Sequence, residues 1–181
     1  MSDVVTRSLA GAAAGFVATG PMTVVMAAGK TQLPPEHQYP LPPRRITERA
    51  AEAVDLHDDL NEPGKHAATG VAHFGYGTAT GALYGALSPL LPFGPVLNGV
   101  AYGLGVWTGS YLGLLPALDL HPPATKEPPG RNALMIGAHV VWGATLGLLT
   151  DQMVCTDQRP AANGSPEDRA RPDFPLVLGG A

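Results

Sequence analysis

The stretch AATGVAHFGYGTATGALYGALSPLLPFGPVLNGVAYGLGVWTGSYLGLLPAL, residues 67–118, decides the fold that the sequence predicts. It is 52 residues long and contains no Asp, Glu, Lys or Arg. A helix that crosses the hydrocarbon core of a bilayer needs about 20 apolar residues, so this stretch is long enough for two. Three prolines and a glycine in SPLLPFGP (88–95) interrupt it. We therefore expect one transmembrane helix over about 67–88 and another over about 96–118.

Two further uncharged runs complete the predicted membrane domain. Residues 8–29 are 22 residues without a charge, and residues 132–150 are 19. They predict spans over about 8–29 and 132–153. The sequence thus predicts an all-α membrane protein with four transmembrane helices within residues 1–155, followed by a flexible polar tail, 156–181. A soluble domain with buried Ala/Gly-rich helices is the alternative, although such helices rarely run uncharged for this long.

Charge and composition exclude several other classes. The net charge is −4 and no basic block is present, so we expect no nucleic-acid partner. The single cysteine, Cys155, cannot form an internal disulfide. No nucleophile–base pair, phosphate loop or Cys/His metal cluster is recognisable, so we expect neither an enzyme nor a metal site. Seven Lys or Arg residues fall on the side of the two long loops and four on the other, which favours both termini outside.

Glycines spaced four apart recur in every predicted span. This spacing puts them on one helix face, where small residues let helix backbones approach in lipid. We therefore expect a compact bundle with little internal cavity. The predicted packing residues are Gly11, Gly15, Gly77, Gly81, Gly99, Gly103, Gly143 and Gly147.

The sequence also contains an internal echo. AHFGYGTATGAL (72–83) is matched by AHVVWGATLGLL (138–149), and LPPEHQYPLPPRR (33–45) is matched by LHPPATKEPPGR (120–131). Matched two-helix units restore the chain direction across a membrane, so the echo predicts two parallel helical-hairpin repeats. Chance similarity among abundant Ala, Gly and Pro is the rival explanation.

The first loop carries one more predicted element. ITERAAEAVDLHDDL (46–60) reads as a short amphipathic helix on the membrane surface or over the mouth of the bundle. Basic residues flank both diproline loops, and we expect Arg44, Arg45 and Arg131 to meet lipid headgroups.

Four segments together resemble the YagU-like group of small bacterial multi-helix membrane proteins. They are LPPRRITERAAEAV (41–54), HFGYGTATGALYG (73–85), GVWTGSYLGLLPAL (105–118) and HPPATKEPPGRNALMIGAHVVWG (121–143). The resemblance covers most of residues 8–150. It implies a multi-pass protein of the bacterial inner membrane, and it implies no settled activity.

The two matched histidines, His73 and His139, are the candidate functional residues. Each lies about 10 Å inside its span, by the 1.5 Å rise per helical residue. Each could donate a hydrogen bond to a backbone carbonyl or a threonine of a neighbouring helix, locking the halves together. Alternatively, the pair could ligate a haem b or a metal, or handle protons.

Three functions follow from these alternatives. The leading hypothesis is a non-enzymatic accessory or scaffold subunit without a cofactor, which packs through its helix faces in a homo-oligomer or a larger membrane complex. The second is a membrane protein that binds a cofactor or ligand through His73 and His139. The third is a small oligomeric transporter or proton pathway.

Overall fold

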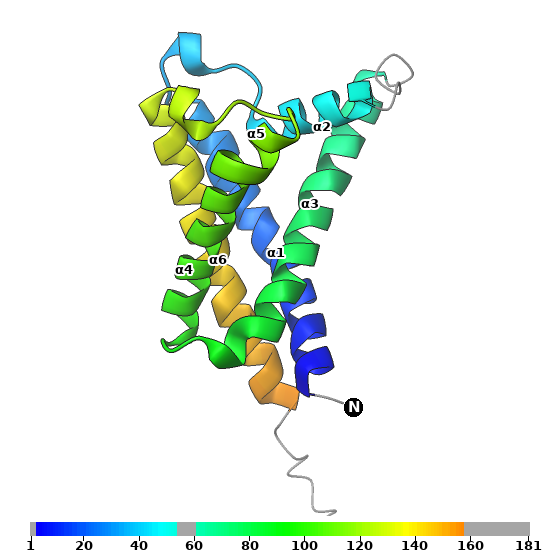
Figure 1. Ribbon diagram of the computed structural model, residues 1–181, viewed down its shortest axis with the longest axis vertical. Helices are drawn as coiled ribbons and strands as arrows, with labels where there is room; N and C mark the ends of the chain where they lie inside the picture. Colours follow the sequence, from blue (N-terminus) through cyan, green and yellow to red (C-terminus); the bar gives the residue numbers. More distant parts are fainter. Residues whose placement is uncertain (1–2, 54–60, 158–181) are drawn as a thin grey trace, which may run out of the picture.

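The computed structural model describes residues 3–53 and 61–157, which form helices and connecting turns without strands (Figure 1). This confirms the all-α prediction. Four long elements run along the bundle axis: α1 (Asp3–Lys30), α3 (Glu62–Leu87), α4 (Pro95–Gly109) and α6 (Pro129–Asp157). The shorter ones are η1 (Pro35–His37), α2 (Pro42–Ala53), η2 (Ser88–Leu90), the π-helix η3 (Ser110–Leu114), α5 (Leu115–Ala117) and η4 (Ala124–Lys126). The predicted tail lies outside the described residues, except for its first two, which end α6.

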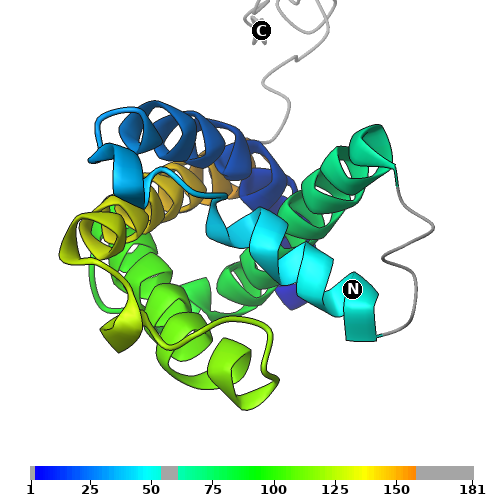
Figure 2. The same ribbon diagram turned by 90° about the horizontal axis from the view of Figure 1, so that it is seen from above.

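The helices form two antiparallel hairpins, α1 with α3 and α4 with α6. The hairpins join along α1 and α6, which pack over much of their length, whereas the backbones of α3 and α4 stay apart (Figure 2). The helix α2 crosses the end of the bundle that holds the long loops. The first residues of α1 and the last residues of α6 lie together at the opposite end.

Close backbone contacts within each hairpin depend on glycine. A Cβ on Gly81 would come under 3.0 Å from the backbone of Gly11 and Gly15, and a Cβ on Gly99 would collide with the carbonyl of Gly143. Seven of the eight glycines that the sequence singled out have such a backbone neighbour, and a Cβ on the eighth, Gly77, would collide with the Thr19 hydroxyl. In contrast, an added Cβ would meet nothing within 4 Å at Gly105, Gly109 and Gly113.

Two helix starts differ from the predictions: a proline explains the first and a capping asparagine the second. The amphipathic helix begins at Pro42 rather than Ile46, because proline fits the first turn, where its missing N–H costs nothing. Its predicted continuation over residues 54–60 lies outside the described residues. The helix α3 begins at Glu62 rather than near residue 67, since the Asn61 side chain accepts a hydrogen bond from the Gly64 amide (2.9 Å) and caps it.

The third predicted span, 96–118, is not a uniform α-helix. After α4, the chain widens into the π-helix η3 and then continues as α5. Pro116 lies just beyond η3, and its ring would clash with the carbonyl four residues earlier in a regular α-helix. The turn after α5 is closed by Asp119 with φ 53°, and by hydrogen bonds from Asp119 to the Pro116 carbonyl and from Leu120 to the Leu115 carbonyl.

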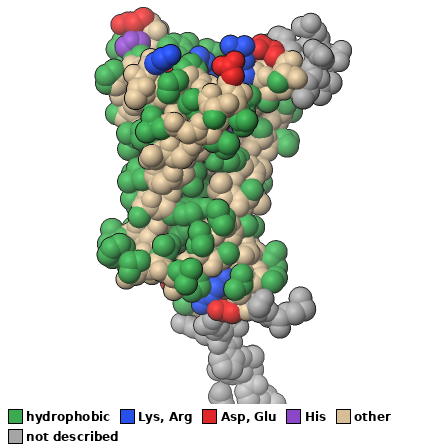
Figure 3. All heavy atoms as spheres, in the orientation of Figure 1, with side chains coloured by type: hydrophobic (Ala, Val, Ile, Leu, Met, Phe, Trp, Pro, Cys, Tyr) green, Lys and Arg blue, Asp and Glu red, His purple; other side chains and the backbone are tan. Residues whose placement is uncertain are grey.

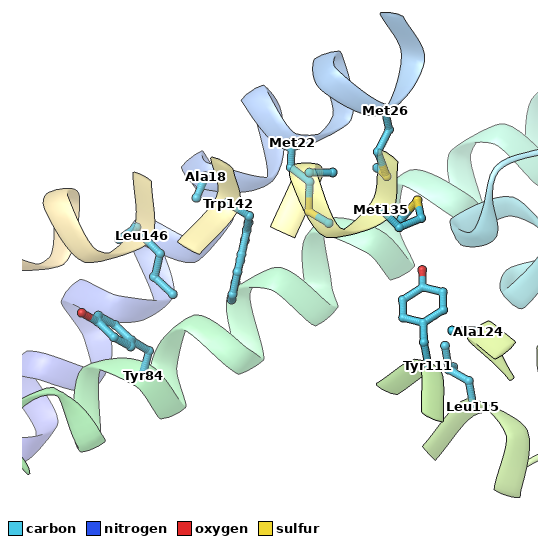
Figure 4. Close-up of a cluster of buried hydrophobic side chains, with 12 residues drawn as sticks. Ala18, Met22, Met26, Tyr84, Tyr111, Leu115, Ala124, Met135, Trp142 and Leu146 are labelled. Atoms are coloured by element: carbon cyan, nitrogen blue, oxygen red, sulfur yellow. The ribbon is translucent and has the colours of Figure 1, made fainter. Parts of the chain in front are cut away.

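On the face that Figure 3 shows, hydrophobic side chains lie along the middle of the bundle and charged side chains gather at its ends. Large apolar side chains such as Phe16, Val24, Val71 and Leu97 are more than half exposed. Of the described helices, α1 and α6 are long and apolar enough to cross a membrane. Inside, a cluster of buried side chains fills the space between α1 and α6, with Met22, Met26, Trp142 and Leu146 among its members (Figure 4).

Candidate functional site

A cavity of about 290 Å³ lies inside the bundle. Residues of α1, α3, α4, η3 and α6 line it, and Pro43, Ile46 and Thr47 of α2 cover its loop-side end. Its volume is at the lower limit of small-molecule sites. The prediction of little internal cavity is therefore wrong: the glycine contacts close each hairpin, but they do not close the space between α3 and α4.

Tyrosine side chains bridge the separated backbones of α3 and the third span. The Tyr102 hydroxyl donates to the Thr80 carbonyl (2.7 Å), and the Tyr76 hydroxyl shares a hydrogen bond with Ser110 (2.8 Å). The rings of Tyr84 and Tyr102 lie 5.2 Å apart. Long side chains thus replace the direct backbone contacts seen within each hairpin. Ser110 belongs to η3, and π-helical turns are often found at functional sites.

His139 points one nitrogen at its own helix and lines the cavity. Its Nδ1 lies 2.8 Å from the carbonyl oxygen of Met135, and the side chain is buried. Because a carbonyl can only accept, Nδ1 carries the hydrogen in this contact and Nε2 keeps a free lone pair. The ring of Tyr111 meets His139 edge-on, with centroids 6.0 Å apart.

His73 of α3 is half-buried and lines the same cavity. Among the described residues it has no hydrogen-bond partner, and its ring packs beside Phe74. The structure thus brings both predicted histidines to one cavity. His139 does not form the predicted interhelical hydrogen bond between the two halves, because its Nδ1 bonds to a carbonyl of its own helix, α6.

A second polar centre lies where the two long loops meet, and Arg131 is its core. Its side chain is 3% exposed. It donates to the carbonyls of His37 (2.8 Å), Tyr39 (3.2 Å) and Pro40 (3.1 Å), and it stacks on the Tyr39 ring at 3.7 Å. The predicted headgroup contact of Arg131 is therefore wrong, because its donors are used inside the protein to fasten the first loop to α6.

Glu127 joins this centre from the second loop. It accepts hydrogen bonds from the Tyr39 hydroxyl (2.6 Å), from Arg45 (3.0 Å) and from Arg131 (3.1 Å). Desolvation raises the pKa of Glu127, but the hydrogen bond from Tyr39 and the two guanidinium charges outweigh it, so the pKa lies below its ordinary value. The carboxylate is thus held charged in a largely buried position.

His121 is buried beside this carboxylate. Its Nδ1 lies 2.7 Å from the Pro122 carbonyl, and its Nε2 is 3.9 Å from Glu127 without a hydrogen-bond partner. Burial lowers the pKa of His121, and the nearby guanidinium charge of Arg45 lowers it further. His121 is therefore held neutral near an acceptor that it does not reach.

Arg44 and Arg131, which stand at the ends of the two matched diproline loops, occupy different settings. Arg44 pairs with Glu48 (2.7 Å) and with Glu62 (2.8 Å), which ties α2 to the start of α3 near the surface, whereas Arg131 is buried. Lipid headgroup contact by Arg44 and Arg45 stays a prediction.

Several residues of the cavity and of the loop centre were not predicted from the sequence. Glu127 and Tyr39 gave no signal, because their contacts join positions 88 residues apart. The three methionines Met22, Met26 and Met135 also line the cavity. Their signal was available: Met22 and Met26, like Met135 and His139, are four residues apart and so share a helix face. In the described part of the chain, no group of three or more His, Cys, Asp and Glu side chains is arranged to hold a metal.

Comparison with known proteins gives one positive result. No curated protein and no solved structure matches the chain. The prediction of an uncharacterised family is confirmed by a family model that matches residues 23–148: the chain belongs to the family described as protein of unknown function DUF1440.

Proposed function

We propose that this chain is an integral protein of the bacterial inner membrane, that it crosses the bilayer four times as two hairpins of parallel orientation, and that it binds a small ligand in the cavity between α3 and α4. The apolar exterior supports the membrane location, since a water-facing surface with so many exposed Val, Leu and Phe side chains would promote aggregation. The proposed activity is binding rather than catalysis.

The observation that carries the ligand proposal is the unfilled cavity with two imidazoles on its wall. Helix bundles ordinarily close such a space, since voids forfeit packing contacts. Here the lining is almost entirely apolar and includes His73, His139 and the Tyr76–Ser110 pair. A few polar groups in an apolar pocket are the usual composition of a small-molecule site.

The native cysteine tests the membrane topology. Cys155 is exposed near the end of α6, at the same end of the bundle as the start of α1. We expect a membrane-impermeant maleimide to label Cys155 in spheroplasts and not in sealed inside-out vesicles, and alkaline carbonate to leave the protein in the membrane pellet. Extraction into the carbonate supernatant would refute the membrane proposal. Labelling from the inside only would reverse the orientation.

A cavity-filling variant tests ligand binding. Val106 lines the cavity from α4, whereas Leu97 of the same helix is exposed. Native mass spectrometry of the protein released from its own membranes should detect a bound mass other than lipid or detergent on the wild type and on Leu97→Phe. The bound mass should be absent from Val106→Phe. An equal bound mass on Val106→Phe, or none on the wild type, would contradict the proposal.

A scaffold or accessory role is the second candidate, and the outer face of the third span favours it. Gly105, Gly109 and Gly113 have open space where a side chain would stand, so this face could accept another helix. Gly109→Leu should then abolish an oligomer or complex seen by cross-linking in membranes. An unchanged cross-linking pattern would count against this role.

A further inference from the structure

We infer that the cavity binds a soft monovalent metal ion, Cu(I), through the thioethers of Met22, Met26 and Met135 and through Nε2 of His139. This inference rests on the proposed cavity and names its ligand. The sequence contains no Cys/His metal cluster, and methionine thioethers form no part of such a pattern.

Two helices bring these donors to one cavity. Met22 and Met26 lie one turn apart on the face of α1 that packs against α6, and Met135 and His139 lie one turn apart on α6. All four line the cavity, and each is at most 6% exposed. Figure 4 shows Met22 and Met26 directed from α1 toward α6, with Met135 beside them and the Tyr111 hydroxyl pointing toward this group.

The donor chemistry selects the metal. Thioether sulfur is a soft ligand that favours Cu(I), and imidazole is a good partner for it, whereas Mg²⁺ and Ca²⁺ require oxygen ligands. His139 is prepared for ligation, because its Nδ1 hydrogen is bound to the Met135 carbonyl and fixes Nε2 as the free donor. His73 on the opposite wall is available as a further ligand.

The absence of charged side chains from the lining also favours a monovalent ion. Among the described residues that line the cavity, none is Asp, Glu, Lys or Arg. A buried ion without a counter-charge is costly, and the cost rises with the square of the charge, so a monovalent ion is tolerated far better than a divalent one. Neutral sulfur and nitrogen donors then take the place of the water molecules that would otherwise solvate the ion.

Methionine also serves as a flexible filler of apolar cores, and this is the ordinary explanation of such a cluster. Two observations weigh against filling alone. Three of the five methionines in the chain surround a space that they leave unfilled. Moreover, His139 lines the same cavity with Nδ1 bonded to the Met135 carbonyl, and a filler role for the methionines leaves the lone pair of Nε2 without a partner.

The test titrates the full-length chain in detergent with Cu(I), under anaerobic reducing conditions and against a chromogenic Cu(I) chelator. All proteins carry Cys155→Ser, so that the thiol cannot bind the metal. We expect one Cu(I) per chain, and we expect Met26→Leu and Met135→Leu each to weaken binding at least tenfold. Leucine nearly conserves the volume of methionine, so the fold should persist. Met153→Leu, on the outer part of α6, is the matched control and should bind as the parent does.

A copper K-edge absorption spectrum of the parent protein gives a readout that does not depend on variants. Sulfur together with nitrogen in the coordination shell would support the site, and a shell of nitrogen and oxygen alone would overturn it. Affinities equal to the control in both leucine variants would overturn it as well. If Cu(I) fails while the Val106→Phe-sensitive ligand persists, the metal inference is wrong and the cavity proposal survives.

Discussion

The contacts within the hairpins and the contact between α3 and α4 use opposite residue types. Within each hairpin, glycines such as Gly81 and Gly99 let backbones touch. Between α3 and α4, Tyr76 and Tyr102 reach across to make hydrogen bonds that leave the backbones apart. The contrast teaches that side-chain size decides where this bundle is closed and where it is hollow.

The contact between α1 and α6 is intermediate. Ala14 and Ala18 are fully buried there, and the Trp142 indole lies over α1, with its nitrogen 3.4 Å from the Gly15 carbonyl. These side chains bring α1 and α6 into contact, and residues of this interface form one wall of the cavity. The loop centre around Arg131 fixes this wall at one end.

The largest effect should come from removing that loop centre. Arg131→Met leaves the Glu127 carboxylate largely buried with fewer partners and three carbonyls without their donor. Breaking a buried charged pair on one side costs about 3–5 kcal/mol. The free energy of unfolding, measured by denaturant titration in detergent, should fall by about that amount. Arg49→Met, at an exposed pair with Glu52, is the control and should change little.

Replacing glycine by alanine should distinguish positions in backbone contact from positions with open space around them. Gly81→Ala and Gly99→Ala each place a Cβ against backbone atoms, and each should lower the free energy of unfolding by about 1–3 kcal/mol. Gly109→Ala has open space and should be neutral, or stabilise by up to about 1 kcal/mol through helix propensity. Equal effects at all three positions, in the same titration, would show that close packing does not set the difference.

Acid should destabilise the loop centre. The pKa of His121 and that of Glu127 both lie below their ordinary values of 6.5 and 4.5 in the folded protein. The unfolded chain therefore takes up protons first, and stability falls as pH drops below about 6.5 and again below about 4.5. For each pH unit by which folding lowers the pKa of a group, the group contributes about 1.4 kcal/mol to the free energy of unfolding at neutral pH.

Thermal unfolding measured from pH 8 to pH 3 checks this dependence. His121→Leu should make the fall that begins near pH 6.5 shallower and leave the one that begins near pH 4.5 unchanged. Glu127→Gln should make the fall that begins near pH 4.5 shallower, and its midpoint at pH 8 should already lie below that of the parent. A midpoint that rises on acidification between pH 8 and 5 would give the opposite sign and contradict the assignment.

The smallest effect should come from the tyrosine contacts. Tyr102→Phe removes the hydrogen bond to the Thr80 carbonyl while keeping the ring, and hydrogen bonds between membrane helices average about 0.6 kcal/mol. We expect a loss of about that size. Spin labels on α3 and α4 should report a broader distance distribution in Tyr102→Phe than in the parent. An unchanged distribution would mean that packing alone holds the two helices.

Local signals in the sequence predicted the helices and their packing glycines well. Uncharged runs gave helices, because an apolar segment of this length has few other ways to satisfy its backbone. The π-helix before Pro116 escaped prediction, since nothing in the spacing of apolar residues distinguishes it from an α-helix. The role of Arg131 was mistaken for the same kind of reason: basic residues that flank apolar runs usually face headgroups, and only the fold brings three loop carbonyls to this one.

The sequence by itself determined that the chain is helical and apolar, with glycine faces that close two hairpins. Tertiary structure alone decided that the hairpins join on one side only, that His73, His139 and three methionines meet at one cavity, and that Glu127 and Arg131 bind the loops together. The reason is physical. Helix formation and face periodicity depend on residues three or four apart, whereas a cavity is the space that large side chains from distant segments leave between them.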